Sequence, residues 1–102
     1  MACYEVKDST IHAGSCQGGD SCLGVQNSII GEGSCTKDKS CHEVVNVKIG
    51  NNSCNGEKVC CLCRHNVPDN ACNQGSTDDL TEDGYCKFCG EKINNNGDNW
   101  CW

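Results

Sequence analysis

Apolar residues recur at a fixed interval of 19 positions over residues 1–63. Two columns of β-branched residues hold this register between polar stretches: Val6, Val25 and Val44, and Ile11, Ile30 and Ile49. Two columns of cysteine hold the same register: Cys3, Cys22, Cys41 and Cys60, and Cys16, Cys35 and Cys54. A short fixed period of this kind indicates supersecondary units that stack on one another.

The repeat unit favours β structure. Nineteen residues are too few for a pair of helices, which takes about 33, and β-branched residues prefer strands. Gly31, Gly33, Gly50 and Asn52 tolerate the positive φ that corners need. The sequence therefore predicts a small, all-β, disulfide-rich fold: a narrow β-solenoid with one 19-residue coil per turn, in which equivalent residues stack about 4.8 Å apart.

The cysteine spacing predicts how each coil is closed. A separation of six residues lets a turn bring two α-carbons within the roughly 4.4–6.8 Å that a disulfide requires. The predicted pairs, each crossing the interior of one coil, are Cys16–Cys22, Cys35–Cys41 and Cys54–Cys60. The alternative joins neighbouring coils within one column, for example Cys22 to Cys41.

The period ends after Cys63, since Cys72 falls one residue short of register and the only proline, Pro68, follows. A solenoid exposes its core at each end and needs a cap. We therefore expect solenoid repeats at 1–63 and a cysteine-rich C-terminal cap at 64–102. Its predicted apolar residues are Phe88, Ile93, Trp100 and Trp102. Six cysteines are predicted to form disulfides in a connectivity that the sequence leaves open: Cys61, Cys63, Cys72, Cys86, Cys89 and Cys101.

Cys3 has no partner in this scheme. By the pattern, its partner would lie six residues upstream, before the first residue of the chain. This favours a fragment of a longer repeat array over the alternative, an intermolecular bond at Cys3.

Composition explains why so many disulfides are expected. Val, Ile, Leu and Phe together supply 16 of 102 residues, a level typical of disordered chains, and 13 cysteines can replace the missing apolar burial by covalent closure. Disulfide-dense chains belong to oxidising compartments, so we expect an extracellular protein. A net charge of −6 without a basic cluster argues against nucleic acid, and no apolar run has membrane length.

Two resemblances follow from the repeat. The module Ser34-Cys35-Thr36-Lys37-Asp38-Lys39-Ser40-Cys41 resembles the Thr-Cys-Thr…Cys coils of beetle antifreeze proteins, which are disulfide-bridged β-helices. It implies an ice-binding face made of Ser15, Gln17, Ser34, Thr36, Ser53 and Asn55, where only one residue in six is Thr. The wider pattern Ile-Gly-x-x-Ser-Cys-x-Gly is similar to uncharacterised cysteine-rich repeat proteins of marine algae, which implies no known activity.

Zinc is the main alternative chemistry for the last cysteines. Cys60 and Cys63 form one Cys-x2-Cys pair, and Cys86 and Cys89 form a second. Four thiolates on two such pairs would make a closed tetrahedral site. Their separation of 22 residues exceeds the usual range of about 15–20, and zinc at Cys60 would leave Cys54 unpaired. We therefore expect no cofactor, with zinc as the alternative.

Catalytic patterns lack supporting context. The chain has no carboxylate pair, Ser-His-Asp set or Gly-rich phosphate loop in a recognisable setting, and its three histidines share no spacing and are expected on the surface: His12, His42 and His65. The sequence thus predicts a non-enzymatic extracellular module with a structural or adhesive role and an unidentified protein or matrix partner. Ice binding and a zinc-dependent interaction module are the alternatives.

Overall fold

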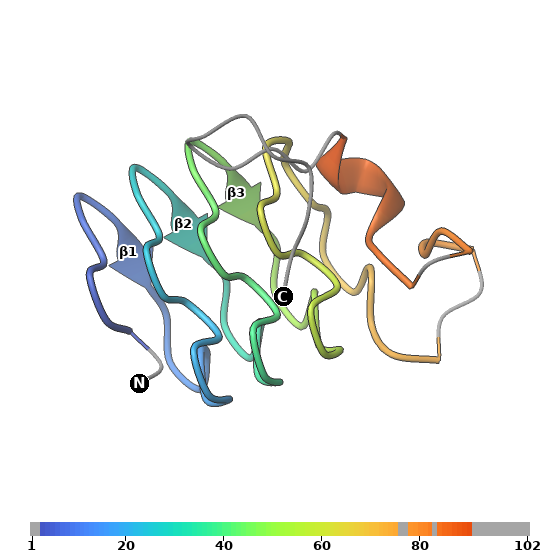
Figure 1. Cartoon of the computed structure of the whole chain (residues 1–102), viewed down its shortest axis with the longest axis horizontal. Coiled ribbons are helices and arrows are strands. Elements are labelled where there is room, and N and C mark those ends of the chain that lie inside the picture. The colour runs from blue at the N-terminus through green and yellow to red at the C-terminus, as the bar shows by residue number, and fades with distance from the viewer. Residues whose placement is uncertain (1–2, 76–77, 83, 91–102) are drawn as a thin grey trace.

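The structure is a computed structural model that describes residues 3–75, 78–82 and 84–90. Over these residues the protein is mostly non-helical, with three strands of two residues each and one short 3-10 helix (Figure 1). The elements are β1 (Thr10–Ile11), β2 (Ile29–Ile30), β3 (Lys48–Ile49) and η1 (Lys87–Cys89). The prediction of a small, strand-containing, disulfide-rich fold is confirmed at this level.

The three strands form one parallel sheet in the order β1-β2-β3. Each strand pairs with the next at an offset of 19 residues, so that Ile11 lies beside Ile30 and Ile30 beside Ile49. Bridges from Lys7 to Gln26 and from Gln26 to Val45 keep the same offset outside the strands. Figure 1 shows the strands side by side on successive loops of the chain. Equivalent positions of the sequence period are therefore neighbours in space.

The register changes by one residue after β3. Ile49 pairs with Val67, an offset of 18, and the Cys54 amide donates to the Ala71 carbonyl at 2.9 Å. The Leu62 amide still donates to the His42 carbonyl, as the Glu43 amide does to Leu23 one repeat earlier. The missing residue thus falls after Leu62 and before Val67, and the parallel pairing resumes beyond it.

Left-handed backbone conformations turn the chain at fixed points of each repeat. Among the residues that the structure describes, fifteen other than glycine have positive φ. Two of the columns are Asp8, Asn27 and Asn46, and Cys16, Cys35 and Cys54. Among the four positions predicted for such corners, Gly33 and Asn52 have φ values of 65° and 53°.

Gly31 and Gly50 do not adopt positive φ, so their predicted role as corners is wrong. Both are needed for close approach instead. A Cβ on Gly31 would lie 2.5 Å from the carbonyl carbon of Gly50, and a Cβ on Gly50 would lie 2.5 Å from the amide nitrogen of Asp69. Successive repeats touch backbone to backbone at this column, which leaves no room for a side chain.

The core consists of two hydrocarbon columns and the buried sulfurs. Val25, Ile30, Val44 and Ile49 are fully buried. They pack in one cluster with the cysteines of the repeats, and Val6, Ile11 and Phe88 pack against this cluster while partly exposed. The other residues predicted for the cap core, Ile93, Trp100 and Trp102, lie outside the described residues.

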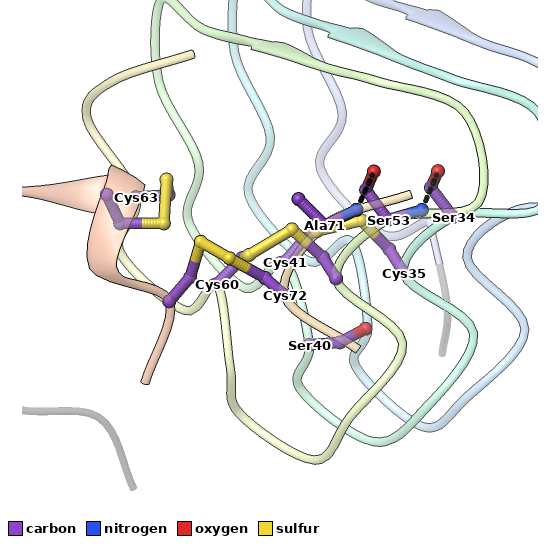
Figure 2. Close-up of a disulfide and its surroundings, with 12 residues drawn as sticks. Ser34, Cys35, Ser40, Cys41, Ser53, Cys60, Cys63, Ala71 and Cys72 are labelled. Atoms are coloured by element: carbon purple, nitrogen blue, oxygen red, sulfur yellow. Dashed lines mark hydrogen bonds between the residues drawn. A yellow bond between two sulfur atoms is a disulfide. The ribbon is translucent and has the colours of Figure 1, made fainter. Parts of the chain in front are cut away.

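A column of serine hydroxyls runs through the interior beside the sulfurs (Figure 2). Ser34 and Ser53 are fully buried. The Ser34 hydroxyl donates to the Gly50 carbonyl and accepts from the Ser53 amide at 3.0 Å. The Ser53 hydroxyl in turn donates to the Pro68 carbonyl and accepts from the Ala71 amide at 3.2 Å. Each hydroxyl therefore satisfies two main-chain groups that burial would otherwise leave unpaired.

Side-chain carbonyls connect successive repeats on the surface in the same way. The Asn51 side-chain oxygen accepts from the Glu32 amide at 2.9 Å, and the Asp69 carboxylate accepts from the Asn51 amide at 2.8 Å. The Asn55 side-chain oxygen accepts from the Thr36 amide at 3.0 Å. These bonds complete the pairing between repeats where the main chain turns away from regular sheet geometry.

Two adjacent glycines offer a test of how closely the repeats stack. A Cβ on Gly18 would lie 2.3 Å from the carbonyl carbon of Lys37, whereas a Cβ on Gly19 would approach nothing closer than 3.6 Å. We expect Gly18→Ala to lower the free energy of unfolding by about 1–3 kcal/mol or more, because main-chain atoms would have to move. Gly19→Ala, the matched control, should change it by less than about 0.5 kcal/mol. Denaturant titration of both variants measures the difference, and equal effects would contradict the close stacking.

Candidate functional site

Each complete repeat contains one internal disulfide. The bridges are Cys16–Cys22, Cys35–Cys41 and Cys54–Cys60, with α-carbons 5.5, 5.6 and 5.7 Å apart. These are the pairs that the six-residue spacing predicts, and no pair among the described cysteines joins two members of one column. All six residues are buried. Figure 2 shows the Cys35–Cys41 bridge beside the serine column.

Two further bridges connect the C-terminal segment. Cys63 pairs with Cys89, and Cys72 pairs with Cys86. Cys61 is disulfide-bonded as well, while the prediction for Cys101 lies outside the described residues. Cys3 is free and exposed.

Three of the disulfides lie close together at the C-terminal end of the repeats. The sulfurs of Cys60, Cys86 and Cys89 lie within 4.8 Å of one another, and all three residues are buried. Each belongs to a different disulfide. We call Cys60, Cys86, Cys89 and their partners Cys54, Cys72 and Cys63 the sulfur cluster.

Main-chain hydrogen bonds hold the C-terminal segment against this cluster. The Cys86 amide donates to the Val59 carbonyl at 2.8 Å, and the Arg64 amide donates to the Cys89 carbonyl at 3.3 Å. Helix η1 begins directly after Cys86, so its three residues carry Cys89 back towards Cys63. The segment is thus joined to the last repeat by both covalent and hydrogen bonds.

The structure brings the four cysteines of the predicted zinc set together but uses their sulfurs otherwise. Cys63 and Cys89 are bonded to each other, while Cys60 and Cys86 are bonded to Cys54 and Cys72. Zinc is bound by thiolates, and a disulfide sulfur carries no such charge. Metal binding by this set would therefore require reduction of all three bridges.

The predicted ice-binding face lies only partly on the surface. Ser34 and Ser53 are fully buried in the hydroxyl column, and Ser15 is half-buried. The Thr36 hydroxyl donates to the Asn55 side-chain oxygen at 2.7 Å, so this pair is bonded across neighbouring repeats. Of the six predicted residues only Gln17 is exposed. The serine half of the prediction is wrong because these hydroxyls are needed inside, by main-chain groups of the next repeat.

His42 and Arg64 are the described groups whose titration is shifted. His42 is 6% exposed, which corrects the expectation of a surface residue. Its Nδ1 lies 3.9 Å from the Cys61 sulfur, and desolvation lowers its pKa. Burial also lowers the pKa of Arg64, whose guanidinium donates to the carbonyl oxygens of Glu43 at 2.7 Å and Cys63 at 3.1 Å. The Arg64 bonds connect Glu43 of the third repeat to the chain that follows Cys63.

Two surface depressions on the described part of the chain are lined mainly by polar side chains. One of about 390 Å³ is lined by residues that include His12, Glu32, Lys48 and Asp69. Another of about 240 Å³ is lined by Thr36, Lys37, Asp38, Glu57 and Gln74. Neither contains a cysteine, so the sulfur chemistry lies away from both. No helix found in the described ranges has the length and apolar character needed to cross a bilayer.

Comparison with protein families gives one finding. A family model described as "Domain of unknown function (DUF7640)" matches residues 1–101. Neither the curated proteins nor the solved structures contain a match to this chain.

Alkylation of the native protein should separate Cys3 from the other cysteines. Without reductant, we expect iodoacetamide to modify Cys3, because its thiol is free and exposed, and to leave the cysteines of the sulfur cluster unmodified, because their sulfurs are bonded. Peptide mapping by mass spectrometry locates the adduct. Adducts at Cys60, Cys63, Cys86 and Cys89 after denaturation would instead indicate the thiolate set that zinc needs.

Burial of His42 predicts a loss of stability in mild acid. Because its pKa is lowered in the folded state, the unfolded chain takes up a proton below about pH 6.5 that the folded chain does not bind. The free energy of unfolding should therefore fall as the pH drops through that value. His42→Leu, which copies Leu23 at the equivalent position, should flatten this dependence. His12→Gln, at an exposed position, is the control and should retain it.

Proposed function

The chain belongs to the DUF7640 family of domains of unknown function, and we propose that it acts as a non-enzymatic extracellular module with a structural or adhesive role. A small disulfide-rich domain of this kind is consistent with an extracellular setting. The proposal depends mainly on how the cysteines are used.

The carrying observation is that sulfur bridges make up much of the interior. Eleven cysteines of the described region are buried, and all of these are disulfide-bonded. Such bridges form and persist in oxidising compartments, whereas the cytosol keeps thiols reduced. Because these sulfurs are bonded and out of solvent, they support a role in holding shape over a role as nucleophiles.

We infer further that the repeats form a β-solenoid with one coil per 19 residues. Parallel pairing at that offset supports this, as does the burial of the Val and Ile columns on the inner side. A solenoid depends on contacts between neighbouring repeats only. Its stability then comes from many equal short-range interactions, which suits a rigid spacer or scaffold.

The outward positions of the sheet form the surface that such a module would offer to a partner. Thr10, Ile29 and Lys48 stand in one column on its exposed side. Lys7, Gln26 and Val45 form the next column of the sheet. A regular array of mixed polar and apolar groups is suited to binding a repetitive protein or matrix partner by many weak contacts, whose effects combine through multivalency.

A second candidate role rests on the closeness of the sulfurs in the cluster. In fully reduced protein, Cys60, Cys63, Cys86 and Cys89 would supply four thiolates within reach of a single zinc ion. The role of a zinc-dependent interaction module therefore belongs to a reducing compartment. The two candidate roles require different oxidation states of the cysteines, and this difference can be measured.

Reduction should separate these roles. We expect dithiothreitol with a chelator to abolish the circular dichroism and dispersed amide resonances of the protein, since removal of a disulfide from a small domain costs about 2–5 kcal/mol. Cys3→Ser should behave as the unaltered chain under non-reducing conditions. Folded, reduced protein that carries one zinc per chain would favour the second candidate.

Location provides the direct test of the first candidate. Antibody raised against the oxidised protein should stain intact cells of the source organism or detect the protein in the medium. Staining that requires permeabilised cells and follows a cytosolic marker would overturn the extracellular role.

A further inference from the structure

Residues 51–53 form an Asn-x-Ser tripeptide, the sequence to which N-linked glycans are attached. It is the only Asn-x-Ser or Asn-x-Thr tripeptide in the 102 residues. The tripeptide begins two residues after β3 ends at Ile49, and its two asparagines, Asn51 and Asn52, lie in a turn. Because such tripeptides also arise by chance, the surroundings of Asn51 decide whether this one can carry a glycan.

The Asn51 side chain is placed to carry a large group. It is exposed, as are the side chains at the equivalent positions of the turns on either side, Glu32 and Asp69. Its Oδ1 atom accepts from the Glu32 amide at 2.9 Å, whereas its Nδ2 atom takes part in none of the hydrogen bonds between described residues. A glycan is bonded to Nδ2, so its attachment leaves the bond to Glu32 in place.

A polar depression lies beside Asn51. Its volume is about 390 Å³, and its lining includes His12, Glu32, Lys48 and Asp69 together with Asn51 itself. The two carboxylates accept hydrogen bonds, and the Lys48 ammonium donates them. These groups are complementary to the hydroxyl and acetamido groups of an N-acetylhexosamine. The first sugar on Asn51 would therefore have polar partners on the protein surface.

The hydroxyl of the tripeptide, by contrast, lies inside the folded protein. Ser53 is fully buried. Its hydroxyl donates to the Pro68 carbonyl, and it accepts from the Ala71 amide at 3.2 Å (Figure 2). The next residue, Cys54, is bonded to Cys60. Attachment requires the third-position hydroxyl, so it has to take place before folding removes that hydroxyl from solvent.

We propose that Asn51 carries an N-linked glycan, attached before the Cys54–Cys60 disulfide forms and Ser53 is buried. The inference rests on the extracellular setting of the proposed function, because N-glycosylation belongs to secreted proteins. In the transfer, the Asn51 amide nitrogen forms a bond to the anomeric carbon of an oligosaccharide linked to a polyprenyl pyrophosphate. The bond between that carbon and the pyrophosphate oxygen breaks, and the lipid pyrophosphate leaves with the electron pair. The amide nitrogen loses one proton to the transferring enzyme.

The glycan would flank the exposed side of the sheet at β3. Lys48 lines the depression beside Asn51, and it also belongs to the outward column that Thr10 and Ile29 begin. The first two repeats contain no acceptor tripeptide. A partner that binds this side of the sheet would therefore contact protein at β1 and β2 and sugar beside β3.

Expression of the full chain behind a secretion signal in eukaryotic cells tests the site. We expect the chain to gain mass that peptide N-glycosidase F removes, with conversion of the Asn51 amide to a carboxylate. Asn51→Asp should abolish this gain, although it keeps an oxygen for the Glu32 amide, as Asp69 does for the amide of Asn51. Asn52→Gly, which copies Gly33 at the equivalent position, keeps the tripeptide complete and should retain the glycan. Retained and secreted chains are both measured, so poor folding does not hide the result.

A reaction in detergent-solubilised microsomes tests the order of events. The microsomes supply the transferring enzyme and the lipid-linked oligosaccharide, and the purified full chain is added either oxidised and folded or kept reduced by dithiothreitol. We expect the folded chain to be modified at least about tenfold more slowly, because Ser53 must first leave the interior. Equal rates would overturn the proposed order.

An unmodified Asn51 in the cells would overturn the site, as would a glycan that survives Asn51→Asp. These results are distinct from failure of the extracellular role. Protein found outside the cells of its source with an unmodified Asn51 would overturn this inference and leave that role intact. A cytosolic location would overturn the role even if the chain accepts a glycan when it is directed into the secretory pathway.

Discussion

One short disulfide in each 19-residue repeat is the constraint on which the rest of the structure depends. With 16 large aliphatic or phenylalanine side chains in 102 residues, hydrocarbon burial alone is small beside the backbone entropy that folding removes. A bridge between cysteines six residues apart restricts the conformations of the unfolded chain at one corner of each repeat. Burial of the Val and Ile columns then has to offset the entropy lost by the remaining residues of each repeat. Disulfides and apolar side chains therefore stabilise one core together.

Because the hydrocarbon core is small, the stability of the fold depends strongly on the hydrogen bonds around it. Strands of two residues satisfy few main-chain groups, and the corners adopt left-handed conformations that regular pairing cannot serve. Ser34 and Ser53 inside, and Asn51 and Asn55 outside, complete the pairing from side chains. The polar composition that resembles disorder is thus partly structural: these hydroxyls and amides replace sheet hydrogen bonds.

The repeating features of the structure could be predicted from the sequence, whereas the non-repeating features could not. The period gave the register between Ile11, Ile30 and Ile49, and the six-residue spacing gave the three bridges of the repeats, because both follow from local chain geometry. The pairings Cys63–Cys89 and Cys72–Cys86 could not be derived, since they depend on how a non-repeating segment folds back. Burial of Ser34 was missed because hydropathy takes a serine to be solvated, although the invariant recurrence of Ser15, Ser34 and Ser53 before each cysteine was a usable signal. Burial of His42 was missed in the same way, although the equivalent positions hold the apolar residues Tyr4, Leu23 and Cys61.

The shortened turn after Leu62 has a consequence for how such chains can vary. An offset of 18 in place of 19 leaves the pairing of Ile49 with Val67 and of Cys54 with Ala71 intact, so the perimeter of a turn is not fixed by the sheet. The loss of one residue between Leu62 and Val67 therefore leaves the pairing on either side of it in place. Gene duplication could therefore lengthen these proteins by whole turns of unequal size, and relatives would be expected to differ in repeat number and in the segment between Leu62 and Val67 before they differ in the Cys-x5-Cys corner.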